Sequence, residues 1–256
     1  MSKEPDSAED LAEGTLLSHL IELRGRLLKV AAAVVFVFIA LLPFARRIFS
    51  LVSEPLRQLL PGQQMIATEV ASPLLTPFKL TFFVALFIAM PVVLYQVWAF
   101  VAPGLYKKEK RFAFPLLATS ILLFYLGIAF AYYVVFPLMF GFFTSVAPEG
   151  VEVMTDISHF LSFITMIVLA FGIAFEVPVA TVLLVWTGLT NIDKLSKARP
   201  YVFLGAFIVG MFLTPPDIIS QTLLAVPVYL LYECGIIMSR IFTRKPEEAE
   251  ESAPVK

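Results

Sequence analysis

The sequence predicts an all-α polytopic membrane protein with six transmembrane helices. Of its 256 residues, 59% are hydrophobic and only 15% are charged, and the mean hydropathy is +0.87. Soluble domains are nearer half apolar and a quarter charged, and so few charges cannot coat the surface of a core this large. The composition therefore excludes a soluble globular enzyme and a disordered chain.

Long runs without Asp, Glu, Lys or Arg give the positions of the spans. A helix needs about 20 residues to cross about 30 Å of hydrocarbon, whereas an outer-membrane barrel would show alternating segments of about ten residues. The runs are continuous, which favours helices. We predict spans near 28–45, 80–102, 112–136, 159–187, 200–213 and 219–239.

The segments outside these spans differ in character. The tails 1–14 and 243–256 are polar or acidic, so flexible tails are expected around a single membrane domain, 15–242. Residues 15–28 place leucines on one helical face, which predicts an amphipathic helix at the membrane interface. The long segment 46–79 has apolar patches and prolines and predicts short helices in an outer cap.

The last two spans and the prolines predict a bundle of irregular shape. The fifth span has about 14 residues, or ~21 Å, and it ends at Thr214-Pro215-Pro216-Asp217. A short hairpin is therefore expected for the fifth and sixth spans. Prolines within or near the spans indicate either packing kinks or a curved, preshaped wall, and the sequence leaves both open. These are Pro43, Pro91, Pro115, Pro137, Pro178 and Pro227.

Basic residues set the expected orientation. With the N-terminus inside, the segments 1–29, 103–111, 188–199 and 240–256 carry 4, 4, 3 and 4 basic residues, whereas the outside loops carry 4 in total. The positive-inside rule therefore predicts that both termini are cytoplasmic.

The sequence offers little for enzymatic chemistry. It contains no HExxH, Walker A, GxSxG or GxGxxG pattern. Cys234 is the only cysteine, and by the expected topology His19 and His159 lie on opposite sides of the membrane. We therefore predict no enzyme, no metal site and no cofactor.

Three groups of polar residues are candidates for function. Glu176 is an isolated acid inside the fourth span, where a carboxylate is costly unless a partner or a watery cavity receives it. Glu22 and Glu109 both lie on the expected cytoplasmic side, although Glu22 can also pair with Arg26 one turn away. The polar groups near the fifth and sixth spans allow plain structural roles: Thr214 and Gln221 can bond a partner helix or cap backbone groups, Asp217 can cap the sixth span, and Glu233 can pair with Arg240.

Seven segments then occur in a telling order, namely HLIELRGRL, MIATEVASPLLTPFKLTF, LYQVWAFVAPGLYKKEKR, PLLATSILLFYLGIAFAYYVVFPL, FGIAFEVPVA, RPYVFLGAFIVGMFLTPPD and SQTLLAVPVYLLYE. Over about residues 15–242 the chain resembles the TatC family, the six-span subunit of the twin-arginine protein translocase. The resemblance implies a cupped bundle in the bacterial inner membrane. It also implies a receptor for signal peptides with two consecutive arginines, which assembles with TatA- and TatB-type single-span subunits, associates with itself and uses the proton-motive force to export folded proteins.

The resemblance also assigns roles to residues of this chain. It implies a twin-arginine recognition site at Glu22, Arg24, Phe100, Pro103 and Glu109. It implies partner contacts within the membrane at Glu176, Thr214 and Gln221, and functional outer-loop positions at Pro55 and Asp217.

Two rival functions follow from the residues alone. A proton-coupled small-solute transporter would use Glu176 as its proton site, but the spans show no second acid for a relay and no paired broken helices. A membrane protease would need either a nucleophile beside a base or a metal cluster, and the sequence shows neither.

Overall fold

The computed structural model describes residues 8–57, 65–101, 110–146, 155–214 and 217–243. Within these ranges it is almost wholly helical, as hydrocarbon requires of a chain that must satisfy its own backbone hydrogen bonds. The elements in order are α1 (Ala8–Leu41), the 3-10 turn η1 (Leu42–Phe44), α2 (Ala45–Arg57), β1 (Met65–Ile66), α3 (Ser72–Val101), α4 (Lys110–Phe130), the π-helical segment η3 (Ala131–Val135), α5 (Phe136–Val146), β2 (Thr155–Asp156), α6 (Ile157–Ala174), α7 (Val177–Trp186), α8 (Ile192–Leu213) and α9 (Ile218–Thr243).

Among the described residues, five helical segments are long and apolar enough to cross a membrane, namely Leu20–Glu54, Ser72–Phe100, Phe114–Val146, Ile157–Trp186 and Ile218–Ile241. The sixth crossing is α8, whose first turns carry the charges of Asp193, Lys194, Lys197 and Arg199. Only its second part is free of charge, which explains why its apolar length is shorter than that of the others. The six-span fold expected from the sequence is confirmed.

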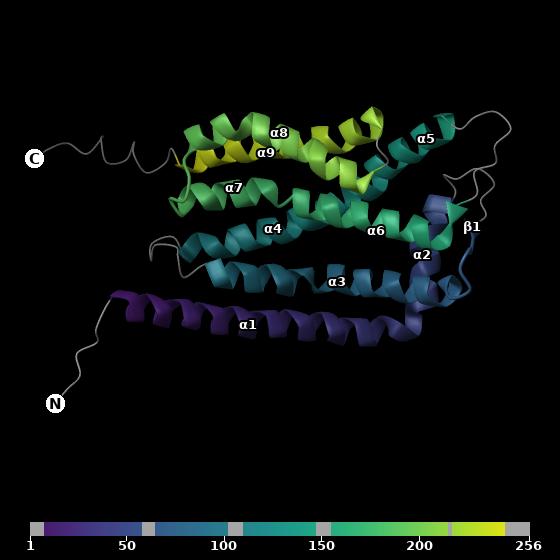
Figure 1. The fold of residues 1–256 in the computed structure, drawn as a ribbon, viewed down its shortest axis with the longest axis horizontal. Coiled ribbons are helices and arrows are strands. Elements are labelled where there is room, and N and C mark those ends of the chain that lie inside the picture. Colours follow the sequence, from purple (N-terminus) through teal and green to yellow (C-terminus); the bar gives the residue numbers. More distant parts are fainter. Residues whose placement is uncertain (1–7, 58–64, 102–109, 147–154, 215–216, 244–256) are drawn as a thin grey trace, which may run out of the picture.

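The spans form an open series and not a closed ring (Figure 1). Successive contacts run from α1 to α3, from α3 to α4, from α4 to α6, and from α7 through α9 to α8. As a result, α1 lies at one edge and the α8–α9 hairpin at the other (Figure 1). The beginning of α1 and the end of α9 lie at the same end of the bundle, and α2 runs across the opposite end (Figure 1). These two ends are called here the terminal end and the outer end.

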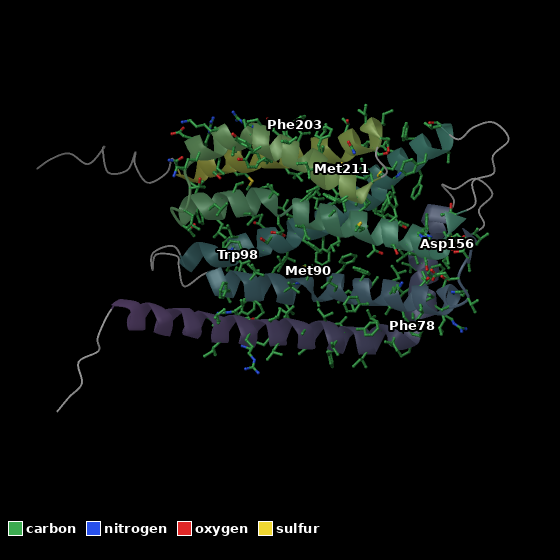
Figure 2. The ribbon with its side chains drawn as sticks, viewed as in Figure 1. Phe78, Met90, Trp98, Asp156, Phe203 and Met211 are labelled. Carbon is green, nitrogen blue, oxygen red and sulfur yellow. The ribbon has the colours of Figure 1, made fainter. Side chains whose placement is uncertain are left out.

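The core of the bundle is built from aromatic and aliphatic side chains. Phe124 of α4 packs with Met90, Leu94 and Trp98 of α3 and with Val179 of α7 (Figure 2). A second cluster joins α5 and α6 through buried phenylalanines, Phe136, Phe140, Phe160 and Phe171. Large apolar side chains also point outward, such as Phe203 and Met211, as expected where the solvent is lipid.

The helices differ from the predicted spans at several places. Helices α3 and α8 begin about eight residues earlier than predicted, at Ser72 and Ile192. The segment 15–28, predicted as a separate amphipathic helix, is the first part of the single helix α1. The span predicted to stop at 136 continues to Val146, because the π-helical segment η3 adds a residue just before Pro137 and so accommodates its missing N–H. The fourth span is interrupted after Ala174 and resumes at Val177, with Pro178 in the first turn of α7.

Glycines bring two pairs of helices into close approach. A Cβ atom at Gly127 of α4 would lie 2.6 Å from the backbone oxygen of Phe171 in α6. One at Gly235 of α9 would lie 2.2 Å from Thr181 Oγ1 and 2.9 Å from Pro178 Cα, both on α7. Small residues at such crossings let backbones of membrane helices touch. The crossing at Gly235 therefore holds α9 against the start of α7, directly after the interruption of the fourth span.

We predict that Gly235→Ala destabilises the bundle by about 1–3 kcal/mol, because the added methyl group overfills this crossing. Thermal unfolding of the detergent-purified protein measures the effect. Gly205→Ala is the matched control, since nothing lies within 4 Å of its added Cβ. Equal melting temperatures for Gly235→Ala and the wild type would contradict the role assigned to Gly235.

Candidate functional site

The acid of the first motif lies on α1. Glu22 accepts a hydrogen bond of 3.0 Å from Arg26 Nε, and Arg26 Nη2 donates to the same oxygen, Oε1. Both side chains are partly exposed, and Arg24 is exposed nearby. The expected pairing one helical turn apart is therefore present. Glu22 already holds a guanidinium group in this geometry.

The other residues expected at the recognition site belong to the connection between α3 and α4. Phe100 lies in the last turn of α3 and is half-buried. Pro103 and Glu109 lie outside the residues that the structure describes. The helices on either side are described: α3 ends at Val101 and α4 begins at Lys110, both at the terminal end of the bundle (Figure 1).

The intramembrane acid lies at the interruption of the fourth span. Phe175 and Glu176 form the turn between α6 and α7. On the neighbouring helices, Ser120 Oγ of α4 accepts a hydrogen bond of 3.2 Å from Trp98 Nε1 of α3. Glu176 Oε1 is buried without a hydrogen-bond partner within the described chain. Residue patterns pointed to Glu176 but gave no sign of Ser120 or Trp98.

Thr214 and Gln221 meet where α8 gives way to α9. Thr214 is buried, and its Oγ1 donates to the Gly210 carbonyl oxygen at 3.0 Å. A Cβ atom at Gly210 would lie 3.7 Å from Gln221 Cα, so the two helices approach closely there. The structure thus brings the two candidate residues to one junction, where Gln221 is partly exposed.

Asp217 and Glu233 have defined structural partners. Asp217 Oδ1 accepts from the backbone N of Ser220 at 2.6 Å, which confirms the predicted cap of the last helix. Of the roles that the sequence left open for Glu233, an ion pair is observed, but with Arg199 in place of Arg240. Arg199 of α8 binds both carboxylate oxygens of Glu233 at 2.6 and 2.8 Å, because the antiparallel hairpin places Arg199 directly opposite. Pro55 lies within α2.

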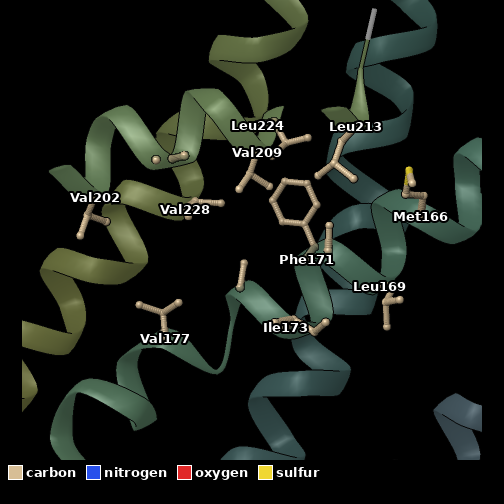
Figure 3. Close-up of a pocket in the computed structure, with 14 residues that line it drawn as sticks. Met166, Leu169, Phe171, Ile173, Val177, Val202, Val209, Leu213, Leu224 and Val228 are labelled. Carbon is tan, nitrogen blue, oxygen red and sulfur yellow. The ribbon is translucent and has the colours of Figure 1, made fainter. Parts of the chain in front are cut away.

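A cavity of about 560 Å³ opens between the halves of the fourth span and the α8–α9 hairpin. Its lining is apolar throughout (Figure 3). Ile173, Ala174 and Val177 face it from the interrupted span, whereas Glu176 is not among the residues that line it. Such a space accepts aliphatic or aromatic groups and disfavours charged ones.

Asp156 makes a polar joint at the outer end that the sequence analysis missed (Figure 2). Its Oδ2 accepts from Thr68 N at 2.9 Å and from Thr68 Oγ1 at 2.7 Å. Its Oδ1 accepts from the backbone N of Ser158 and of His159, which caps α6. Beside it, β1 and β2 pair in parallel. The only signal in the sequence was an Asp just before a helix, which predicts the cap but not Thr68.

The described residues contain no group of three or more His, Cys, Asp or Glu that could hold a metal ion. Their ionisable groups instead form isolated pairs and caps at helix ends, around a largely apolar bundle. The fold and these sites together define a multi-pass α-helical membrane protein.

Comparison with known proteins gives the family. The model of the family described as "Sec-independent protein translocase protein (TatC)" matches residues 18–227. The TatC protein of Azotobacter chroococcum mcd 1 is 57% identical over 255 residues, which covers 99% of each chain. That of Escherichia coli K12 is 58% identical over 237 residues, 92% of each chain.

A solved structure agrees with this. The crystal structure of the twin-arginine translocase receptor TatC superposes with a TM-score of 0.80 at 36% identity, over 88% of this chain and 100% of that one. The chain therefore belongs to the TatC family of protein translocase subunits. That family transports proteins and is not an enzyme family, which also separates the chain from small-solute transporters.

We predict that Asp156→Ala lowers the melting temperature at pH 7. The hydrogen bonds from Thr68 hold the pKa of Asp156 well below its usual range. The carboxylate therefore contributes stability at every pH above the ordinary value of about 3.9, and that contribution is lost as the pH falls further. Thermal unfolding of both proteins between pH 3 and pH 8 is the measurement.

The difference between wild type and Asp156→Ala is expected to be constant from about pH 5 to 8 and to shrink below about pH 4. Asp193→Ala, which removes an exposed acid, is the control. A difference that grew on acidification would contradict the assignment.

Proposed function

We propose that the chain is the signal-peptide receptor of a twin-arginine translocase. Glu22 and Glu109 bind the two consecutive arginines of the signal peptide at the cytoplasmic face, with Arg24, Phe100 and Pro103 beside them. The observation that carries this proposal is the place of Glu22 in the first half of α1, whose beginning lies at the same end of the bundle as the end of α3 and the beginning of α4 (Figure 1).

The pairing of Glu22 with Arg26 supports the proposal that the Glu22 carboxylate can bind an arginine of the signal peptide. A guanidinium group forms two directed hydrogen bonds with a carboxylate, which a lysine ammonium cannot reproduce. Both bonds from Arg26 reach Oε1 of Glu22. Solvent-screened pairs are worth at most about 1 kcal/mol. The two arginines therefore determine the specificity for the signal peptide. Most of the affinity comes from burial of its apolar part on the concave wall of the bundle.

The proposed orientation has both termini in the cytoplasm of a bacterium and the chain in the inner membrane. The beginning of α1 and the end of α9 lie at one end of the bundle (Figure 1), and the basic residues concentrate in the segments at that end. In this orientation the joint at Asp156 and the cap at Asp217 lie outside, together with α2, which carries Pro55.

The partners proposed are TatA- and TatB-type single-span subunits and further copies of this chain, with transport driven by the proton-motive force. Glu176 provides one partner contact, because Oε1 is a buried acceptor without a donor in the described chain. Thr214 and Gln221 provide a second contact at the α8–α9 junction. Hydrogen bonds between membrane helices average about 0.6 kcal/mol, so these residues set the register of the partner more than its affinity.

We predict that Glu22→Ala combined with Glu109→Ala abolishes site-directed cross-linking of an Arg-Arg signal peptide to the protein in membranes. The loss follows from removal of both carboxylate acceptors. A peptide with Lys-Lys in place of Arg-Arg is the ligand control, since it keeps the charge and loses the fork geometry.

Cross-linking yield and export of a folded cargo protein are measured in parallel. Glu54→Gln is the protein control, because it neutralises an acid of α2, the helix at the outer end of the bundle. Undiminished cross-linking and export in the double variant would remove the recognition claim.

We predict that Glu176→Ala reduces the recovery of the single-span subunits with this chain after purification in mild detergent. The expected reduction is about threefold, the value of one hydrogen bond between membrane helices. Quantified subunit ratios are the readout. Wild-type ratios together with normal export would count against a partner contact at Glu176.

A further inference from the structure

Helix α3 contains a proline in its second half, at Pro91. Proline has no N–H, so the carbonyl oxygen of Phe87, four residues earlier, loses the hydrogen bond that a regular helix would give it. Inside hydrocarbon no water replaces that bond, and a neighbouring helix has to supply the donor. Pro91 is therefore a joint in α3, where the helix depends on a contact from outside itself.

Helix α4 supplies this donor through Tyr125. Tyr125 Oη donates a hydrogen bond of 3.0 Å to the carbonyl oxygen of Phe87. The hydroxyls of Thr165 and Thr222, by contrast, donate to carbonyl oxygens four residues earlier in their own helices. A tyrosine hydroxyl inside a span also needs a partner. The bond between α4 and α3 therefore satisfies two groups at once, the hydroxyl and the carbonyl oxygen that the proline leaves open.

A second hydrogen bond joins the same two helices on the other side of the joint. Trp98, two turns after Pro91, donates from Nε1 to Ser120 Oγ of α4 at 3.2 Å, and both side chains are buried. Between the two bonds, Phe124 of α4 belongs to the same buried cluster as Met90 and Trp98 of α3. Helix α4 therefore contacts α3 before and after the joint and holds its two parts in one relative position.

The part of α3 after the joint leads to the proposed recognition site. It carries Phe100 in its last turn and ends directly before the connection to α4. Helix α1, which carries Glu22, packs on α3, and the aromatic contact between Phe38 of α1 and Phe82 of α3 lies before the joint. A change of direction at Pro91 would therefore move Phe100 and the start of the connection with respect to Glu22.

We propose that Tyr125 is a positioning residue for signal-peptide recognition, because its hydrogen bond to Phe87 closes the joint at Pro91 and so fixes the end of α3 relative to Glu22. This role rests on the proposed recognition of two arginines by Glu22 and Glu109. A guanidinium group binds a carboxylate through directed hydrogen bonds, whereas a lysine ammonium is a point charge. A loosened joint therefore weakens binding of an Arg-Arg peptide more than binding of a Lys-Lys peptide.

Cross-linking of Arg-Arg and Lys-Lys signal peptides to the full chain in membranes tests this role. Tyr125→Phe removes the hydroxyl and keeps the ring. At subsaturating peptide it is expected to lower the Arg-Arg yield by about threefold, the value of one hydrogen bond between membrane helices, and to leave the Lys-Lys yield unchanged. Tyr133→Phe is the matched control, since it makes the same change at an exposed position of the same span. An equal fall for both peptides would overturn the positioning role, because a general loss of folded protein lowers both.

The variant Pro91→Ala shows whether Tyr125 acts through the joint. This change restores an N–H at position 91, so the Phe87 carbonyl oxygen regains a donor within its own helix. Tyr125→Phe is then expected to cause no further loss of Arg-Arg cross-linking in the Pro91→Ala background. Additive losses would overturn the proposal. A wild-type chain that does not distinguish the two peptides would instead remove the proposed recognition itself, and the positioning role with it.

A distance measurement checks the joint without any peptide. Spin labels are attached through Val97→Cys, after the joint in α3, and Met166→Cys in α6, both at exposed positions, in a background in which the exposed Cys234 is changed to serine. Tyr125→Phe is expected to broaden the distribution of distances between the labels, and Pro91→Ala in addition is expected to narrow it again. A distribution that Tyr125→Phe leaves unchanged would overturn the proposal, whatever the peptides show.

Discussion

The need to satisfy polar groups without water governs this protein. Inside hydrocarbon, each unpaired backbone or side-chain group costs several kcal/mol, and the described spans meet that demand mostly within single helices. Threonine hydroxyls bond to their own backbone, and the ion pair of Arg199 with Glu233 closes the α8–α9 hairpin. Against this background three buried side-chain oxygens of the described residues have no hydrogen-bond partner, Ser53 Oγ, Ser220 Oγ and Glu176 Oε1, and only Glu176 among them is an acid.

Close helix crossings lie on both sides of the interruption of the fourth span. Gly235 lets α9 touch α7 beside Pro178, and Gly127 lets α4 touch α6 beside Phe171. The turn that carries Glu176 is therefore bounded by two tight crossings. An interruption in a free helix would flex, whereas here the helices on both sides of the turn are packed closely against their neighbours.

The two ends of the bundle are built differently. At the outer end, Asp156 joins segments 88 residues apart in sequence through hydrogen bonds to Thr68 and to the first turn of α6. On the side of the termini, Glu22 lies in the first half of α1, an edge helix that packs mainly on α3 and exposes most of its surface. An outer end joined by hydrogen bonds and an exposed edge helix are compatible with the receptor role proposed for this chain.

The sequence by itself determined the class of the protein, the number of spans and the family, because charge-free runs and local motifs report on lipid exposure residue by residue. It also predicted the cap at Asp217, which depends only on the neighbouring residues of the chain, and it made Glu22 and Glu176 candidates for function. The tertiary structure decided the partners: Trp98 with Ser120, Thr68 with Asp156, and Arg199 with Glu233. These pairs join residues on different helices or loops, and their meeting depends on how the helices cross, which no single segment of the sequence encodes.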